Sequence, residues 1–272
     1  MTGLDTDRRA REYRDAYDSQ LRSRLLVGDP AKVTVETVGP VRRKTPPEGR
    51  GLIVYTDLGG LDGAELDEFI AAQRDHFAKR GQPVEWKYHG YDRPADLPDR
   101  LRAAGFVPEE TETIVIGEAA DHVIANRLPG GVELVELSTK DDLDRVRVML
   151  EAVWNDDFGW LPGELSSEKA SAQDPVVVFG AQADGELVCA AWIRFHNGTE
   201  FTSLWGGSTL PAWRGKGIYR AMVARRAQLA LARGFKYLQF DCTQDNRVIL
   251  RRLGMSWVAT TVPYVWKADT GN

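Results

Sequence analysis

Apolar and polar residues follow two different periods along the chain. Between residues 64 and 79 the apolar positions Leu66, Ile70 and Phe77 recur at helical spacing, which predicts an amphipathic helix. Shorter apolar runs bounded by turn-forming residues are typical of strands. Because the two patterns interleave, we expect an α/β protein with a mixed α+β sheet. The expected helices are 5–26, 64–79, 95–104, 140–154, 163–171, 217–233 and 245–253. The expected strands are 32–38, 50–57, 84–88, 111–116, 132–137, 176–183, 187–196, 200–210, 236–242 and 256–267.

Changes in composition divide the chain into four parts. The first 27 residues are rich in Arg and Asp and predict a solvent-exposed helix. Residues 117–130, which run into the Pro129-Gly130-Gly131 turn, predict a linker. We therefore expect an N-terminal helix (1–27), a first lobe (28–116), the linker, and a second domain (131–272).

The two halves of the chain echo each other. The sequence Leu101–Phe106 resembles Leu250–Met255, and in both an expected helix stops at Gly before an apolar residue opens a strand. The preceding elements also come in the same order. This predicts a degenerate internal duplication, and chance similarity between two ordinary α/β segments is the alternative.

Composition is that of a globular protein, with 43% hydrophobic and 28% charged residues among 272. The N-terminus lacks the apolar run of a secretory signal, and no stretch is long and apolar enough to predict a transmembrane helix. Two cysteines and four histidines without ligand spacing predict neither a disulfide framework nor a metal site. We therefore expect a cytoplasmic protein without a metal and without a membrane partner.

The segment 206–222 carries the clearest chemical signal. A strand with a Gly206-Gly207 pair leads into a loop, Arg214-Gly215-Lys216-Gly217, and then into a long helix. Glycines at a helix start let backbone approach a ligand, and the first helical turn attracts anions. The loop fits neither the Walker pattern nor the dinucleotide fingerprint, because Leu210 and Arg220 stand where each needs a glycine.

Charge supports a phosphate ligand independently. The segment 211–254 holds ten basic and two acidic residues, a net charge of +8, whereas the whole chain has −5. A local basic patch on an acidic protein suits a compact polyanion better than a long nucleic acid. A solvated arginine stripe on an amphipathic helix is the alternative.

The run Pro211–Tyr219 resembles the acetyl-CoA loop of the GCN5-related N-acetyltransferases, the GNAT family. Arg214 and Gly217 match its Gln/Arg-x-x-Gly-x-Gly/Ala signature, and Tyr219 departs from it. The resemblance covers about residues 131–267. It implies a central, mostly antiparallel sheet flanked by helices, with strands splayed at the acyl-CoA site, and acetyl-CoA as cosubstrate without a metal. The coenzyme-binding residues that it implies are Thr209, Leu210, Arg214, Gly215, Lys216, Gly217, Ile218, Tyr219 and Asn246. For Asn246, a helix cap is the alternative.

Together with the internal echo, the resemblance predicts two tandem GNAT-like lobes. The first copy reads Asp57–Gly63 where the second has the phosphate loop, with two Asp and no Lys or Arg. Carboxylates there would repel phosphate. We therefore expect a degenerate N-terminal lobe with a structural role that does not bind the coenzyme.

The groups that the family often uses for proton transfer are replaced here. The positions of its frequent Glu and Tyr hold Ser203 and Leu250. We expect Asp241, at a splayed strand end, to act as base directly or through water, unless it pairs with a local arginine. Glu200 and Tyr264 are further catalytic candidates. Tyr219 is a candidate acid, and Cys242 is either an acyl acceptor or a buried apolar residue.

The acceptor pocket is expected at 153–163, which in the family covers the acceptor. Asp156, Asp157 and Trp160 would suit a small cationic amine through ion pairing and cation–π contact. An aromatic core plug with capping aspartates is the alternative.

These residues predict direct transfer of an acetyl group to a primary amine in a ternary complex, by a protein that could form a homodimer. A non-catalytic acyl-CoA sensor is the first rival. The second is a protein- or nucleic-acid-interaction module, against which the net charge counts.

Overall fold

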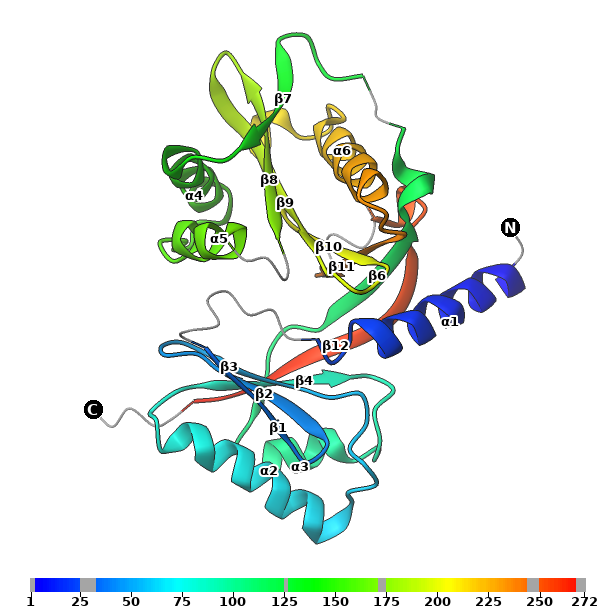
Figure 1. Ribbon diagram of the computed structural model, residues 1–272, viewed down its shortest axis with the longest axis vertical. Coiled ribbons are helices and arrows are strands. Elements are labelled where there is room, and N and C mark those ends of the chain that lie inside the picture. Colours follow the sequence, from blue (N-terminus) through cyan, green and yellow to red (C-terminus); the bar gives the residue numbers. More distant parts are fainter. Residues whose placement is uncertain (1–2, 25–32, 125–126, 171–174, 244–249, 268–272) are drawn as a thin grey trace. The chain divides into compact units, whose positions relative to one another are not determined.

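The computed structural model describes residues 3–24, 33–124, 127–170, 175–243 and 250–267. It divides into two compact units (Figure 1). The N-terminal unit contains the described residues of 1–115, 242–248 and 257–272. The C-terminal unit contains those of 116–241 and 249–256.

The N-terminal unit is built on a mixed sheet with the order β1-β2-β3-β4-β12. Its strands are β1 (Thr34–Val38), β2 (Val41–Thr45), β3 (Gly51–Val54), β4 (Val84–His89), β12 (Ser256–Trp266) and the short β5 (Val107–Pro108), which pairs with β12. Its helices are α1 (Gly3–Gln20), α2 (Gly63–Ala78) and α3 (Leu97–Ala103). The pair β3/β4 is parallel, with α2 as the crossover, and the other pairs are antiparallel.

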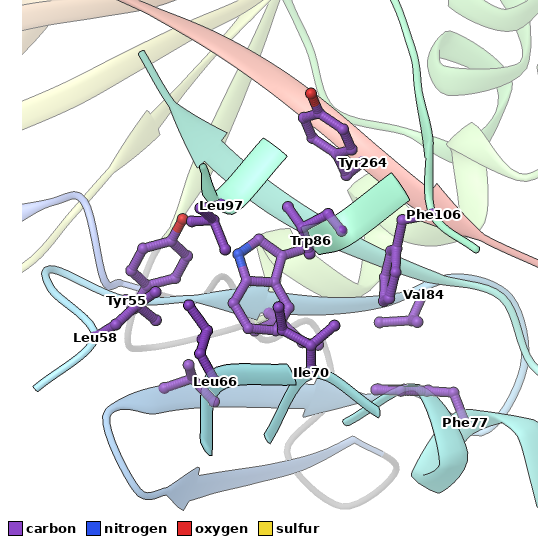
Figure 2. Close-up of a cluster of buried hydrophobic side chains, with 13 residues drawn as sticks. Tyr55, Leu58, Leu66, Ile70, Phe77, Val84, Trp86, Leu97, Phe106 and Tyr264 are labelled. Carbon is purple, nitrogen blue, oxygen red and sulfur yellow. The ribbon is translucent and has the colours of Figure 1, made fainter. Parts of the chain in front are cut away.

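A cluster of fully buried side chains joins this sheet to α2 and α3. Trp86 lies at its centre, and Phe106 packs edge-on against the indole at 6.4 Å between ring centres (Figure 2). The partly buried Phe69 packs edge-on against the same indole at 6.5 Å. Burial of aromatic side chains on this scale stabilises a unit that also holds several charged residues.

The helix α1 is not the solvent-exposed helix that its composition predicted. Tyr13, Tyr17 and Leu21 are buried, and their spacing of four residues places them on one face. The many Arg and Asp residues on the other faces hid this stripe. The helix also ends at Gln20, before the expected end at 26.

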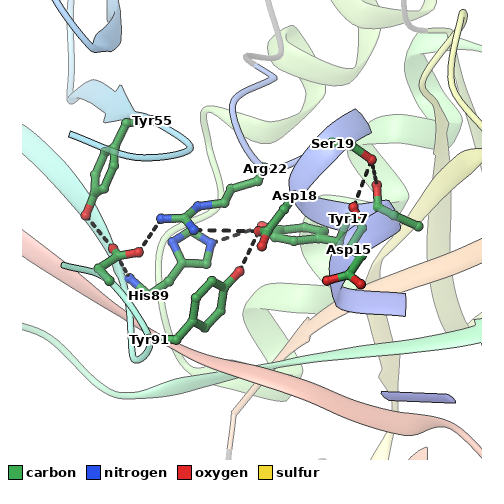
Figure 3. Close-up of polar contacts among 10 residues, drawn as sticks. Asp15, Tyr17, Asp18, Ser19, Arg22, Tyr55, His89 and Tyr91 are labelled. Atoms are coloured by element: carbon green, nitrogen blue, oxygen red, sulfur yellow. Dashed lines mark hydrogen bonds and ion pairs between the residues drawn. The ribbon is translucent and has the colours of Figure 1, made fainter. Parts of the chain in front are cut away.

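Charged residues after α1 lie inside the N-terminal unit. Arg22 is 5% exposed and forms an ion pair with Asp92. The carboxylate of Asp92 also accepts hydrogen bonds from the Tyr55 hydroxyl (2.6 Å) and the His89 backbone N–H (2.9 Å). Figure 3 shows Arg22 between Tyr55 and Asp18. A buried charge with this many partners fixes the geometry of the strand ends around it.

The C-terminal unit has the strand order β7-β8-β9-β10-β11. Its strands are β7 (Val132–Leu137), β8 (Val176–Ala183), β9 (Glu186–Phe195), β10 (Phe201–Thr209) and β11 (Tyr237–Cys242). The first four are antiparallel, and β10/β11 is parallel with α6 (Ile218–Ala232) as the crossover. The helices α4 (Lys140–Trp154) and α5 (Leu161–Lys169) lie on one face of this sheet and α6 on the other (Figure 1).

The linker expected at 117–130 is partly regular structure. Strand β6 (Glu112–Glu118) continues into the start of the expected linker, and a short helix follows at Ala119–His122, with Ala119 and His122 buried.

The final strand crosses the domain boundary that the sequence predicts. The sequence places β12 in the domain 131–272, yet β12 pairs with β4 over six residues of the N-terminal unit. A distant partner in the sheet leaves no local mark on the sequence.

The glycine caps of the two echoing segments are confirmed. Gly105 and Gly254 have φ of +89° and +86°. In each, the N–H of the next residue binds the carbonyl five residues back, at 2.9 Å for Phe106 and 3.2 Å for Met255. The strand–helix–parallel-strand order also occurs twice, as β3–α2–β4 and β10–α6–β11. This agrees with the internal duplication, which stays a prediction.

Burial of His89 predicts a loss of stability in acid. Burial lowers its pKa to about 2, and Arg22 and Lys87 act in the same direction. Below pH 6.5 the His89 side chain therefore binds a proton in the unfolded chain but stays neutral in the folded protein. Between pH 7 and pH 5 this group should cost about 2 kcal/mol of unfolding free energy.

Urea unfolding of wild type and His89→Gln at both pH values measures this effect. The comparison cancels the opposite contribution of Asp92, whose pKa is raised by burial. We expect the variant to lose less stability than wild type on acidification. Equal losses in both proteins would contradict the assignment.

Candidate functional site

The strands β10 and β11 separate soon after they meet. Only Phe201–Ser203 pair with Tyr237–Gln239, while β10 runs on to Thr209. Over that stretch β10 keeps its pairing with β9, interrupted by a bulge between Trp205 and Ser208. The splay expected from the sequence is thus present, and it leaves backbone of β10 without a strand partner on the β11 side.

Two large side chains explain the glycines at the bulge. Gly206 has φ +66° and lies against the Trp192 ring, so a Cβ would collide with the indole. A Cβ on Gly207 would lie 2.6 Å from Cε2 of Tyr219, the second residue of α6. The bulge is therefore fitted to β9 on one side and to the start of α6 on the other.

The loop after β10 is the expected glycine loop. It passes through a short helix, Pro211–Trp213, and two glycines with φ of +74° and +83°, Gly215 and Gly217, before α6 begins at Ile218. Nε of Arg214 donates to the carbonyl of Thr209 (3.0 Å), which folds the loop back on the strand. The exposed Lys216 lies over the Trp213 ring at 4.5 Å. All the coenzyme residues expected from Thr209 to Tyr219 therefore lie on one continuous turn.

One of the arginines that suggested phosphate binding is inside the protein. Arg226 on α6 is 1% exposed, and its Nη1 donates to the carbonyls of Trp192 (3.2 Å) and Trp205 (3.4 Å). Desolvation lowers the pKa of this guanidinium. Arg226 therefore holds the bulged strand β10 through hydrogen bonds made inside the protein. Because its charge is buried, the basic patch that a ligand could reach has one arginine fewer than the sequence indicates.

The face of the sheet toward α4 and α5 carries a row of polar side chains. Ser203 bonds Nε2 of His196 at 2.8 Å and accepts from Nε1 of Trp205 at 2.7 Å. Beside it, Arg194 donates twice to the carboxylate of Glu168, at 2.7 and 2.9 Å. This row was missed in the sequence. Its signal was the alternation of polar residues with Ile193 and Phe195 in an otherwise apolar strand.

Asp241 lies at the open end of β11. Its Oδ1 accepts a hydrogen bond from Nε2 of Gln239 (3.0 Å), and its side chain is half-buried, whereas Ser203 and His196 are almost fully buried. Gln239 pairs in register with Ser203, so Asp241 lies on the same face of the sheet as Ser203. The structure brings this carboxylate to the splay.

Glu200 is not brought to the loop, and Tyr264 belongs to the other unit. Glu200 is exposed and precedes the first residue of β10, roughly 30 Å along the strand from Thr209 at about 3.3 Å per residue. Tyr264 belongs to the core cluster of the N-terminal unit, where it packs against Tyr88 at 6.0 Å and Arg102 at 5.6 Å. The sequence predicts the strand of each residue, but it reveals neither the distance of Glu200 from the loop nor the core that Tyr264 joins.

The remaining candidates have varied positions. Cys242 is buried, in agreement with its interpretation as an apolar residue. Thr209 donates its hydroxyl to Sγ of the buried Cys189 (3.2 Å), whose pKa is raised by burial. Leu250 is fully buried, and Asn246 lies outside the described residues.

The expected acceptor segment is a turn rather than a core plug. Asp156 accepts a hydrogen bond from the N–H of Asp157, and Asp157 accepts one from the N–H of Gly159, each at 2.8 Å. Neither aspartate caps α5, whose N-cap is Trp160. Trp154 and Trp160 are 55% and 57% exposed. Nε1 of Trp154 donates to Oγ of Ser208 on β10 (2.9 Å). An exposed aromatic segment is thus attached to the strand that leads into the glycine loop.

Among the residues that the structure describes, no three His, Cys, Asp or Glu side chains gather in a way that could hold a metal ion. No described helix has the length and apolar character needed to span a bilayer.

Comparison with known proteins assigns the fold. The model of the acetyltransferase (GNAT) family matches residues 143–253. A GCN5-related N-acetyltransferase from Kribbella flavida has a TM-score of 0.67 and 17% identity, over 97% of this chain and 96% of its own. A tandem GNAT protein from the clavulanic acid biosynthesis pathway has a TM-score of 0.67 and 14% identity, over 98% and 97%. No curated protein matches the sequence. The chain therefore has the mixed α/β fold of the GNAT acetyltransferases.

The contact between Gly207 and Tyr219 predicts a coupled pair of substitutions. Gly207→Ala should lower the unfolding free energy by about 1–3 kcal/mol, because the new methyl group enters the tyrosine ring. In a Tyr219→Ala background the same change should cost much less. Denaturant unfolding of the four proteins measures the coupling.

Gly163→Ala is the matched control, because Gly163 is exposed in α5 and its Cβ would meet nothing within 4 Å. It should be neutral or slightly stabilising. An equal cost of Gly207→Ala in both backgrounds would show that the ring contact does not set the strand geometry.

Proposed function

We propose that the C-terminal unit transfers an acetyl group from acetyl-CoA to a primary amine. The observation that carries this proposal is the opening of β10 from β11 after three residue pairs, directly before the glycine loop and α6. An open strand edge offers backbone N–H and C=O groups to the amide-bearing pantetheine arm. The loop and the first turn of α6 suit its pyrophosphate. The family match at 143–253 covers both features.

The loop has the charge that this ligand needs even without Arg226. Arg214, Lys216 and Arg220 all have exposed side chains around the start of α6. Gly215 and Gly217 let phosphate oxygens approach the backbone, while Thr209 and Leu210 would line the pantetheine arm. Ile218 and Tyr219 are the first two residues of α6, and their packing positions the first helical turn beside the loop.

Asp241 is the proposed base of the reaction. The amine nitrogen attacks the thioester carbonyl and loses a proton, the C–S bond breaks, and the leaving sulfur takes up a proton, so that coenzyme A departs as a thiol. Asp241 accepts the proton from nitrogen directly or through one water and passes it on to the sulfur, since it is a half-buried carboxylate at the splay. The nearby Ser203–His196 pair is too deeply buried to meet a substrate in this structure.

The proposed acceptor is a small cationic amine. Asp156 and Asp157 supply negative charge, and Trp160 supplies an exposed ring, in a turn that Trp154 ties to β10. Carboxylates and an aromatic face together attract an ammonium group. The bond from Trp154 to Ser208 connects this turn to the strand that would line the pantetheine arm.

Titration calorimetry of acetyl-CoA tests the coenzyme site. Arg214→Ala combined with Gly217→Asp should weaken binding at least about tenfold, because a side chain at φ +83° is strained and the new carboxylate repels phosphate. Arg225→Ala, an exposed arginine on the second turn of the same helix, should bind like wild type. No binding by folded wild type would remove the transferase proposal.

Release of free thiol with a panel of amines tests the chemistry. Asp241→Asn should lower kcat by about 10²–10⁴-fold with acetyl-CoA binding unchanged, whereas Glu200→Gln and Tyr264→Phe should retain activity. Asp156→Ala plus Asp157→Ala should raise KM for the amine alone. Coenzyme binding without turnover of any amine would favour a non-catalytic acyl-CoA-binding module.

A further inference from the structure

The N-terminal unit contains a cavity at the position that corresponds to the glycine loop. Its volume is about 460 Å³, within the range of small-ligand pockets. It is lined by the end of α1, the segment 55–62 between β3 and α2, and the loop 91–94 after β4. The pair β3–α2 precedes a parallel strand as β10–α6 does, so the cavity occupies the equivalent place in the other strand–helix–strand unit.

The charge of this cavity is opposite to that of the glycine loop. Its lining includes four aspartates, at positions 18, 57, 62 and 92, and two arginines, Arg22 and Arg93. Arg22 forms ion pairs with Asp92 and with Asp18, whose carboxylate lies 3.6 Å from the guanidinium. The surplus is negative, and a phosphate-bearing ligand would meet carboxylates at the place where the other unit offers basic side chains.

The exposed rim supplies the carboxylates that a ligand could reach. Asp57 accepts the N–H of Gly59 (2.7 Å), and Asp62 caps α2 through the N–H of Gly63 (2.7 Å). Each of these bonds uses one carboxylate oxygen. Arg100 comes within 3.7 Å of Asp62, but it bonds more closely, at 2.8 Å, to Asp67 and Asp96.

On the inner wall of the cavity, two tyrosine rings already contact a cation of the protein itself, the guanidinium of Arg22. The guanidinium of Arg22 lies 5.3 Å from the centre of the Tyr55 ring and 5.0 Å from that of Tyr91. Nε of Arg22 is buried and has no hydrogen-bond partner within the described part of the chain. Arg22 thus covers the tyrosine rings of the wall, and the wall still holds a buried donor that lacks an acceptor among the described residues.

We propose that this cavity binds a small organic cation that also carries a hydrogen-bond acceptor, such as an amino alcohol or an amino sugar. The rim carboxylates of Asp57 and Asp62 hold its ammonium group, and the half-buried side chains of Leu61 and Pro94 in the lining cover its apolar part. The site is separate from the proposed coenzyme loop and does not depend on it. It gives the N-terminal unit a binding role that its acidic loop could not fulfil for coenzyme A.

Ligand-observed NMR and calorimetry on the full chain at pH 6.5 test this proposal with glucosamine and choline as probes. Glucose, which resembles glucosamine in size but has no charge, is the matched ligand. We expect both cations to bind and glucose not to bind. Failure of both cations to bind, or equal binding of glucose, would overturn the proposal.

Two sets of variants locate the binding. Asp57→Asn plus Asp62→Asn removes both charges but keeps the oxygens that bond Gly59 and Gly63, so the turn and the cap survive. We expect at least tenfold weaker cation binding. Asp99→Asn, an exposed aspartate on α3 outside the cavity, should bind like wild type.

Asp156→Ala plus Asp157→Ala separates this site from the proposed acceptor segment. If that pair abolishes cation binding while the Asp57/Asp62 pair leaves it intact, the cation binds in the C-terminal unit and the cavity proposal is wrong. Arg214→Ala should leave cation binding unchanged. A failure of the coenzyme site therefore cannot be mistaken for a failure of this one.

Discussion

The separation of β10 from β11 is the constraint on which the C-terminal unit depends. It is held by packing on both sides of a two-glycine bulge, with Trp192 against Gly206 and Tyr219 against Gly207. Arg226 adds hydrogen bonds to two strand carbonyls from inside the protein. Removing a guanidinium from water costs free energy unless its hydrogen bonds are made, so these bonds hold only if α6 and β10 keep their present spacing. A shift of α6 relative to β10 would break these bonds and change the strand separation on which the proposed coenzyme site rests.

The same strand–helix–strand arrangement appears in both units with opposite charge. After β10 the chain places exposed basic side chains and two glycines of positive φ at the helix start. After β3 it places Asp57 and an Asp62 that caps the helix itself. The Asp62 side chain bonds a backbone N–H at the start of α2 that an anion could otherwise bind. The start of α6 has no such side-chain cap, so its first N–H groups stay available to an anion. The loop sequences, and not the fold, therefore distinguish the two proposed ligand chemistries.

Local patterns were enough to predict most elements of the C-terminal unit. The strands 132–137 and 176–183 and the helix 140–154 match the structure residue for residue, because clear periodicity ends there at turn residues and at the Thr139 cap. Long-range partners could not be predicted. The pairing of β12 with β4, the place of Tyr264 in the other core and the inward direction of Arg226 all depend on residues far away in sequence. Periodicity reveals a face but not what covers it.

The replacement of a strand carboxylate by Ser203 follows from its surroundings. Ser203 pairs in register with Arg194, and Arg194 already has both oxygens of Glu168. A second carboxylate at this nearly fully buried position would lack a counter-charge of its own and would cost several kcal/mol. Serine instead satisfies His196 and Trp205 without charge. The proposed reaction then needs a carboxylate that keeps contact with water, and Asp241, one strand away on the same face, is half-buried.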